Sequence, residues 1–280
     1  VFSSEWDPFA QKTYEANFGE VPFGDIGQIP ANEIPKFDIL VAGFPCQPFS
    51  SIGKRQGFEH PTQGTLFYDI VRILAHHKPK MFLLENVAGL TTHDCGRTLE
   101  IILETLDDLG YEVNWSVLNA ADYGVPQYRE RIYLVGTKRS WRKHGKFEFP
   151  QPSRRRVGIG KHIETNVTGY EISNHLQRSY IFKLPDGRPQ VIDPQSDFPV
   201  KTLVSTYHKI QRLTGTFVAD GPTGLRLLTE NECKAVMGFP KSFKVPVSRT
   251  QMYRQFGNSV AVPVVKKIAK NMASLFTEGR

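Results

Sequence analysis

Residues 37–50 of this 280-residue chain read FDILVAGFPCQPFS, and this stretch decides the fold that the sequence predicts. Its first half, 37–43, is an apolar run typical of a buried strand in a parallel sheet. Its second half holds Cys46 between two prolines, whose fixed φ angles stiffen the loop. Open α/β sheets bind ligands at the carboxyl ends of their strands, so Cys46 is a candidate for chemistry there. The alternative is a structural cysteine, because free cysteines are commonly buried.

The composition predicts one large domain, or a large domain with a smaller one, since 40% of the residues are hydrophobic. No apolar run approaches the roughly 20 residues of a membrane span, and no signal peptide is visible. The three cysteines form no CxxC pair. They argue for a reducing compartment and against a disulfide or zinc framework, and we predict no metal site.

The positive charge is concentrated in one segment. The chain carries a net charge of +7, yet residues 138–161 contain nine Lys or Arg and one acid, so this segment alone carries +8. A basic stripe on a nearly neutral body favours a surface that binds phosphate groups. The alternative is an ordinary solvated loop.

Hydrophobic periodicity predicts alternating helices and strands up to about residue 150 and a different texture after it. Residues 153–224 are rich in Gly, Pro, Thr, Asn and Asp and favour a separate, mostly β or irregular module. Val1–Asp7 reads as the end of a strand, and Gln255–Val260 as a polar turn. The expected helices are 8–18, 65–77, 97–109, 229–237 and 263–275, and the further expected strands are 81–84, 112–119 and 132–136.

Charged residues follow several of these strands. Glu85 ends the apolar strand 81–84, so it is expected in the same crevice as Cys46. Arg129 and Arg131 share one face of an extended segment, where two guanidiniums suit a phosphate, or a base carbonyl with a carboxylate. Surface salt bridges are the alternative. Glu5 and Trp6 suit the ribose hydroxyls and the purine of a nucleotide, although a packed Trp at a strand end is equally consistent with the sequence.

Five short motifs, taken in order and spacing, resemble the cytosine-C5 DNA methyltransferase family, especially the small bacterial enzymes of restriction–modification systems. The resemblance implies a Rossmann-like α/β fold for S-adenosylmethionine-dependent transfer, with a mixed sheet and a smaller, mostly β or irregular target recognition domain. It implies a catalytic and cofactor domain at 1–167, a recognition domain with hinge at 168–254, and a returning helix at 255–280. The motifs are Pro45-Cys46-Gln47, Glu85-Asn86-Val87, Gln127-x-Arg129-x-Arg131, Arg226 to Pro240, and Gly257-Asn258-Ser259-Val260.

The family's chemistry assigns a role to each candidate catalytic residue. The resemblance implies that Cys46 adds to C6 of a flipped cytosine as a thiolate, which leaves C5 able to accept the methyl group. Glu85 is implied to hold the N3 and amino edge of the base. Arg129 and Arg131 are implied to orient the base and the backbone around Cys46.

The resemblance also implies a binding site for the methyl donor, S-adenosylmethionine. Relatives begin with a strand and a glycine-rich loop that this chain lacks, so we expect either truncation or a split enzyme whose separate chain supplies that loop. The matching donor-binding positions are Glu5, Trp6, Asp25, Ile26, Pro45, Leu66, Asn258 and Val260.

Double-stranded DNA is the expected substrate, and we expect a monomer in the bacterial cytoplasm that does not bind membranes. The alternatives are a DNA-binding subunit of a split enzyme, inactive without its partner, and a tRNA cytosine-5 methyltransferase. Lys201-Thr202-Leu203 resembles the segment of relatives in which a Thr-Leu pair supports the flipped nucleotide. The expected DNA contacts are Ser50, Lys54, Arg55, Arg154, Arg155, Arg156, Lys201, Thr202 and Arg212.

Overall fold

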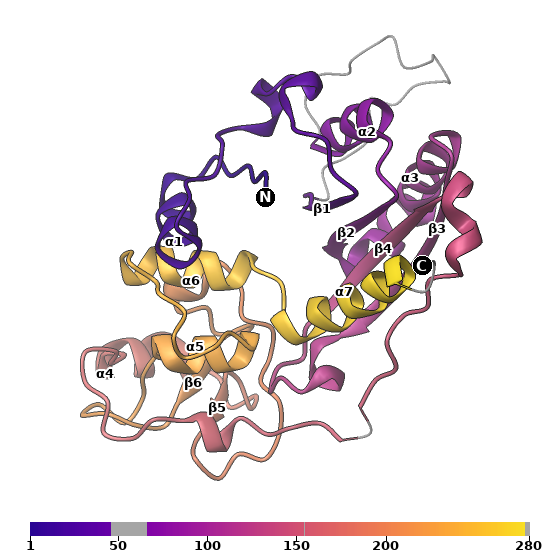
Figure 1. The fold of residues 1–280 in the computed structure, drawn as a ribbon. Helices are drawn as coiled ribbons and strands as arrows, with labels where there is room; N and C mark the ends of the chain where they lie inside the picture. The colour runs from indigo at the N-terminus through magenta and orange to yellow at the C-terminus, as the bar shows by residue number, and fades with distance from the viewer. Residues whose placement is uncertain (46–65, 154, 278–280) are drawn as a thin grey trace.

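A four-stranded mixed sheet forms the centre of the larger part of the molecule (Figure 1). The computed structural model describes residues 1–45, 66–153 and 155–277. The strands lie in the order β1-β2-β4-β3, with β1 parallel to β2 and with β4 antiparallel to both β2 and β3. Their bounds are β1 Ile39–Gly43, β2 Met81–Val87, β3 Tyr111–Asn119 and β4 Glu130–Lys138.

Helices cover both faces of this sheet because the residues of β2 are apolar on both of its sides. Phe82 and Leu84 pack with helices α2 (Leu66–His77) and α3 (Arg97–Asp108). Met81 and Leu83 pack on the other face with helix α7, Val262–Thr277. Strand side chains alternate between faces, so one continuous apolar strand serves two cores. The predicted strands 81–84, 112–119 and 132–136 and the predicted helices 97–109 and 263–275 are confirmed to within a few residues.

The exposure of β1 differs from the expectation. The strand is parallel as predicted, but it is not buried, because Val41 is 64% exposed and the residues alternate between exposed and half-buried. Among the described residues, β1 pairs only with β2 and therefore lies at an edge of the sheet. The apolar residues of β1 would allow the strand to be buried on both faces. Its position at the edge of the sheet leaves part of it exposed.

The N-terminal segment also differs from the expectation, because Val1–Asp7 is not part of a strand in the sheet. Ser4 forms a single parallel bridge with Phe23. Asp7 then caps helix α1 (Pro8–Phe18) by accepting hydrogen bonds from the N–H groups of Phe9 and Ala10. Ser3 and Glu5 exchange their backbone hydrogen bonds with Phe23, at 2.8 Å each, rather than with a strand of the sheet. Helix α1 itself has the predicted bounds and ends at Gly19, in the left-handed conformation with φ 76°.

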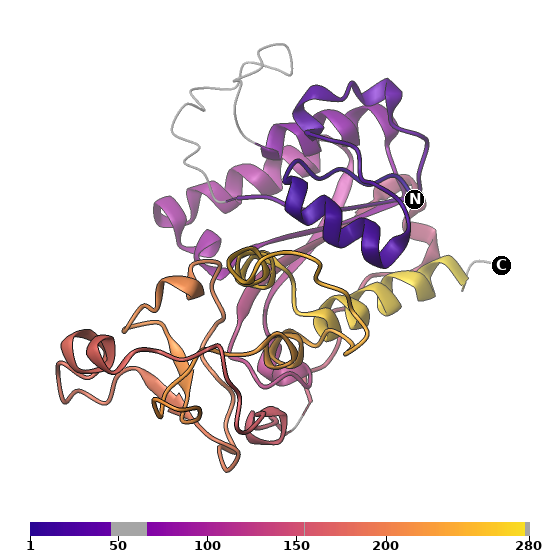
Figure 2. The ribbon, with the colours of Figure 1, turned by 90° about the vertical axis from the view of Figure 1, so that its left-hand side faces the viewer.

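The smaller part of the molecule has its own apolar core and little regular structure, as predicted (Figures 1 and 2). The predicted helix 229–237 is confirmed as α5, and a capping box formed by Thr229 and Glu232 begins it. The predicted turn at Gln255–Val260 is wrong, because helix α6 continues to Asn258, started by the Ser248 cap. The elements are α4 Asn174–Leu176, β5 Gln190–Ile192, β6 Thr216–Val218, α5 Glu230–Met237 and α6 Arg249–Asn258.

Helix α1 lies beside α6, so the first residues of the chain contact its last quarter (Figures 1 and 2). Thr13 Oγ1 donates to Gln255 Oε1 at 2.8 Å, and Asn17 Nδ2 donates to the carbonyl oxygen of Lys244 at 2.8 Å. Within the described ranges, no helix is both long and apolar enough to span a membrane.

Candidate active site

An ion pair between Glu85 and Arg131 lies at the edge of the sheet where β2 ends and β4 begins. Arg131 Nε lies 3.1 Å from Glu85 Oε1, and the two side chains are 16% and 18% exposed, respectively. Val87, two residues beyond Glu85, pairs with Arg131 in the antiparallel register, so the diagonal across the strands brings the two side chains together. The pair is recessed but open to a ligand.

The segment that contains Cys46 leaves the sheet beside Glu85. Gly43 is the register partner of Glu85 on β1, and the Phe44 N–H donates to the Glu85 carbonyl oxygen at 3.4 Å. A Cβ at position 43 would lie 3.5 Å from Glu85 Oε2, so glycine leaves that side of the carboxylate clear. Pro45 is exposed at the end of this segment. Cys46 itself lies outside the described residues.

The surroundings of Glu85 change its acidity. Burial raises the pKa of the Glu85 carboxyl above its usual range, and the positive charges of Arg131 and Arg129 act in the opposite direction. Desolvation exceeds the effect of two cations because the carboxylate loses water on several sides. A carboxyl group with a raised pKa can hold a proton and donate it, as well as accept a hydrogen bond.

Arg129 occupies a different place from Arg131, although both residues were expected to orient the base. Arg129 is 2% exposed and donates to three backbone carbonyl oxygens, those of Leu203 at 3.1 Å, Gly257 at 2.9 Å and Ser259 at 2.7 Å. Burial lowers the pKa of Arg129 to about 10, and the charge of Arg131 contributes to this shift. The guanidinium remains charged at neutral pH and is bonded to protein groups.

The residues expected to bind a methyl donor lie on segments that neighbour one another. The Glu5 N–H donates to the Phe23 carbonyl oxygen at 2.8 Å, which brings Glu5 and Trp6 close to Asp25. Trp6 is 77% exposed. Arg72 of α2 donates to the Ile26 carbonyl oxygen.

The remaining donor-site candidates lie at or near helix ends, and the carboxylates of Glu5 and Asp25 already accept hydrogen bonds from the backbone. Leu66 begins α2 and is exposed, and Asn258 ends α6, with half-buried Val260 two residues later. Glu5 accepts a hydrogen bond from the Asp7 N–H, and Asp25 accepts one from the Gly27 N–H.

The expected DNA contacts divide into exposed and internal groups. Arg155 and Arg156 are exposed, and Arg156 forms a 2.7 Å ion pair with Asp122. Lys201 donates to the Leu213 carbonyl oxygen at 3.3 Å. Arg212 is buried, and its guanidinium is bonded to Asp186 and to two backbone carbonyl oxygens. Ser50, Lys54, Arg55 and Arg154 lie outside the described residues.

Tyr128 is an exposed residue that the sequence interpretation missed. Its ring lies 5.2 Å from the Arg156 guanidinium, and its carbonyl oxygen accepts a 2.6 Å hydrogen bond from Thr202 Oγ1. The signal was present, because Tyr128 alternates with Gln127 and Arg129 in an extended segment and so faces the other way. Tyr128 therefore joins Arg156 and Thr202 on the surface.

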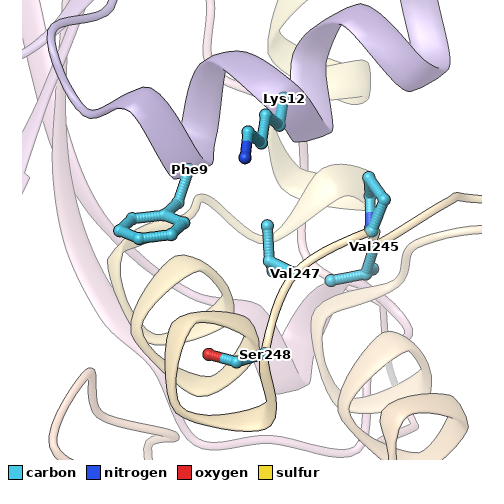
Figure 3. A pocket seen from close by; sticks show the side chains of 6 residues that line it. Phe9, Lys12, Val245, Val247 and Ser248 are labelled. Carbon is cyan, nitrogen blue, oxygen red and sulfur yellow. The ribbon is translucent and has the colours of Figure 1, made fainter.

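A pocket of about 330 Å³ lies elsewhere, between α1 and the segment that precedes α6 (Figure 3). Phe9 and Lys12 line it on one side and Val245, Val247 and Ser248 on the other. Ser248 caps α6, and Lys12 is the one charged residue among the described residues that line the pocket. This pocket is separate from the Glu85–Arg131 pair, and we assign no chemistry to it.

Comparison with known families and structures agrees with this geometry. Residues 1–274 match the family described as C-5 cytosine-specific DNA methylase. The chain is 62% identical to the type II methyltransferase M.MspI of Moraxella sp over 98% of its own length and 65% of that relative. It is 57% identical to the type II methyltransferase M.BsuFI of Bacillus subtilis, over 97% of its length and 66% of that relative. The chain thus spans slightly less than two thirds of these relatives.

Solved structures share the fold at low sequence identity. A Spodoptera frugiperda DNMT2 mutant superposes with a TM-score of 0.77 at 22% identity, covering 99% of this chain and 92% of that one. The S. pombe Dnmt2 methyltransferase superposes with a TM-score of 0.75 at 21% identity, covering 100% of this chain and 91% of that one. The predicted fold class, a mixed α/β sheet of the methyltransferase type with a smaller irregular domain, is therefore confirmed.

Proposed function

The chain belongs to the C-5 cytosine-specific DNA methylase family, and we propose that it methylates C5 of cytosine in duplex DNA, with S-adenosylmethionine as the donor. The observation that carries the proposal is the recessed Glu85–Arg131 pair beside the segment that leads into Cys46. The relatives M.MspI and M.BsuFI are named type II methyltransferases, which supports a role as the modification enzyme of a restriction–modification system. They come from bacteria, which supports a bacterial cytoplasmic location.

We propose that Cys46 is the nucleophile. Its thiolate adds to C6 of cytosine, and the electron pair of the C5=C6 bond moves through the ring toward N3. Glu85 donates a proton to N3, for which the raised pKa of its carboxyl group suits it. Arg131 holds the carboxyl group in place and offers further N–H donors to the base. C5 then accepts the methyl group. A water molecule or hydroxide removes the C5 proton, the thiolate leaves C6 as the C5=C6 bond re-forms, and N3 returns its proton to Glu85.

The recessed position of the pair supports a target base that leaves the duplex. The Glu85 and Arg131 side chains are less than one fifth exposed, so they cannot reach N3 of a stacked cytosine. Extrusion of the base costs a few kcal/mol, which contacts to the DNA backbone must offset. Arg155, Arg156, Lys201, Thr202 and Tyr128 are the described residues that we propose for these contacts. We leave Arg212 out because its guanidinium is bonded within the protein.

The residues present suit one side of an S-adenosylmethionine site. Glu5 and Asp25 offer carboxylate oxygens for ribose hydroxyls and for an adenine amino group, and the exposed Trp6 indole suits stacking on the adenine. Asn258, exposed at the end of α6, offers an amide group. When bound, the donor supplies an electrophilic methyl group. This chain's residues would bind the donor and orient it toward the edge of the sheet.

The exposed edge of β1 supports a further strand in the functional enzyme. Val41 and Ile39 present apolar side chains there, and a parallel strand on that edge would cover them. We propose that such a strand, followed by a glycine-rich loop, completes donor binding, supplied by the same protein or by a separate chain. The division at 1–167, 168–254 and 255–280 and the monomeric state remain proposals.

Transfer of a labelled methyl group from S-adenosylmethionine tests the proposed function. We expect label in a mixed pool of duplex DNA and none in bulk tRNA. We expect Cys46→Ala to abolish transfer and to leave DNA binding intact. Label in tRNA alone would replace DNA with tRNA as the substrate. Bound DNA without label would indicate that the added strand and loop are required, which the same assay on a protein extended at its N-terminus then tests.

A further inference from the structure

Three segments that are distant in sequence meet at the Arg129 side chain. Its backbone belongs to the segment that leads into β4, where its carbonyl oxygen accepts from the Ala120 N–H at 2.9 Å. Its guanidinium reaches Leu203 in the smaller part of the molecule, and Gly257 and Ser259 at the end of α6. One buried side chain thus joins the catalytic sheet to two other parts of the chain.

The first connection continues along four residues on each side. The Val200 N–H donates to the Pro126 carbonyl oxygen at 2.9 Å, and the Tyr128 N–H donates to the Val200 carbonyl oxygen at 2.8 Å. The Leu203 N–H donates to Gln127 Oε1 at 2.7 Å, and Arg129 binds the carbonyl oxygen of the same residue. Residues 200–203 are therefore held against 126–129, and Thr202 is held with them.

The second connection depends on a close approach of two backbones. A Cβ at Gly257 would lie 2.1 Å from the Ser205 nitrogen and 2.3 Å from the Val204 carbonyl carbon. Only glycine allows this contact, so the last turn of α6 lies directly on residues 204–205. Arg129 binds the carbonyl oxygens of Gly257 and Ser259, on either side of Asn258.

We infer that Arg129 is a positioning residue that couples DNA binding at Thr202 to methyl-donor binding at Asn258 and Val260. This inference rests on the proposed function, which places DNA and donor on those residues. If residues 200–203 move toward DNA, the Leu203 carbonyl group that accepts a hydrogen bond from Arg129 changes its position. The same guanidinium then transmits the change to the 257–260 segment, because its geometry is rigid and planar.

Arginine suits this role better than any other residue. Its guanidinium carries five N–H donors in a fixed plane, so it can bind carbonyl groups from two directions at once, whereas the ammonium of lysine is a compact point charge. Among the described residues, Arg129 Nε has no hydrogen-bond partner. The contacts to Leu203, Gly257 and Ser259 therefore all pass through the two terminal nitrogens.

The test measures how DNA changes the affinity for a donor analogue. The dissociation constant of S-adenosylhomocysteine is measured by calorimetry, with and without a saturating duplex that the transfer assay has identified as a substrate. For the wild type we expect the duplex to tighten binding at least about fivefold, within the usual range of coupling between sites. For Arg129→Met we expect this ratio to fall to about one, with each ligand still bound on its own, and for Arg129→Lys an intermediate ratio.

Gln177→Met provides the matched control. Gln177 Nε2 also holds two backbone carbonyl oxygens, those of Ile172 at 2.7 Å and Thr223 at 3.0 Å, but away from this junction. We expect it to keep the wild-type ratio. A wild-type ratio of one, or an unchanged ratio in Arg129→Met, would overturn the inference. A ratio of about one in Gln177→Met as well would show that the effect of Arg129→Met reflects lost stability, and it would overturn the inference.

A second measurement needs no variant and therefore does not depend on whether Arg129→Met folds. Hydrogen exchange of the wild-type amides in 257–260 is compared with and without the duplex pool, in the absence of donor. We expect DNA alone to slow this exchange at least about threefold. Unchanged exchange with DNA bound would overturn the coupling. Failure of the wild type to bind any duplex would count against the proposed function instead.

Discussion

Two ion-pair sites of this protein contain the same kinds of charged group and differ in how far protein groups satisfy them. In the smaller part of the molecule, Arg226 is fully buried and donates to Asp220 and to both oxygens of Glu232, each at 2.8 Å. Glu232 also accepts from the backbone N–H groups of Glu164 and Thr229. At the sheet edge, Glu85 pairs with Arg131, and no backbone N–H of the described residues donates to its carboxylate.

The difference shows how one kind of chemistry serves two purposes. A closed network such as that of Arg226 leaves no bonding capacity for a ligand, so it fixes the structure. The Glu85–Arg131 pair is partly buried, and protein groups do not use all of its hydrogen-bonding capacity. The unused donors and acceptors are therefore available to a substrate. The pKa values follow the same division: that of the Glu85 carboxyl is raised by burial, whereas that of Asp220 is lowered.

The largest expected effect comes from Glu85→Gln. The amide of glutamine has the same shape as the carboxyl group of glutamate but cannot act as a general acid. We therefore expect kcat to fall about a thousandfold. The melting temperature is expected to stay close to the wild-type value, because the site does not hold the fold together. Steady-state methylation kinetics and thermal unfolding measure the two effects. Wild-type kcat in this variant would remove Glu85 from the chemistry.

Arg226→Met is expected to affect stability instead. The substitution leaves Glu232 buried without its cation, which typically costs about 3–5 kcal/mol of the free energy of unfolding. Urea unfolding measures this change, with Arg131→Met as the comparison at the more exposed pair. Equal losses from the two substitutions would contradict the division between a structural and a functional site.

Acid should weaken the Arg226 site. Burial raises the pKa of Asp220. The hydrogen bonds from Arg226 and from backbone N–H groups lower it by more, so the pKa lies below its usual range. A lowered pKa contributes stability above the unfolded-state value of about 4, and this contribution is lost as the pH falls below it. We expect Asp220→Asn to be less stable than the wild type at pH 7 and to depend less on pH below about 4. Urea unfolding across this range measures both, and parallel curves would contradict the assignment.

The smallest effect is expected from a surface charge. Arg156→Glu should weaken binding to all DNA sequences and reduce the slope of log affinity against log salt by about one to two. Lys80→Glu is the matched control, because Lys80 also pairs with an aspartate, Asp38, but lies outside the basic segment 138–161, just before β2 and at the opposite end of that strand from Glu85. Fluorescence anisotropy at several salt concentrations measures the slopes. Equal slopes for the two variants would place the DNA elsewhere.

Local patterns predicted much of this fold because they act over short distances. The apolar run of β2 and the helical periodicity of α1, α3 and α5 each appear within a dozen residues. The position of Glu85 beside the segment that leads into Cys46 followed from the rule that the carboxyl ends of parallel strands meet at one edge of a sheet. Such features need no knowledge of distant contacts.

The features that were missed depend on distant parts of the chain. The exposure of β1 is set by its place in the sheet, and helix α6 continues through Gly257 because residues 204–205 pack directly on it. The carbonyl groups that hold Arg129 belong to residues 74 to 130 positions away. Sequence spacing could place Arg129 beside Arg131, but it could not show that the two guanidiniums have different partners.

The central claim is that Glu85 and Cys46 activate C5 of cytosine, and release of tritium from DNA labelled at that carbon tests it most directly. Methylation at C5 must displace the label, so we expect the wild-type chain to release one tritium for each methyl group transferred. We expect neither Glu85→Gln nor Cys46→Ala to release label at a measurable rate. Methyl transfer without tritium release, or wild-type release by Glu85→Gln, would contradict the account.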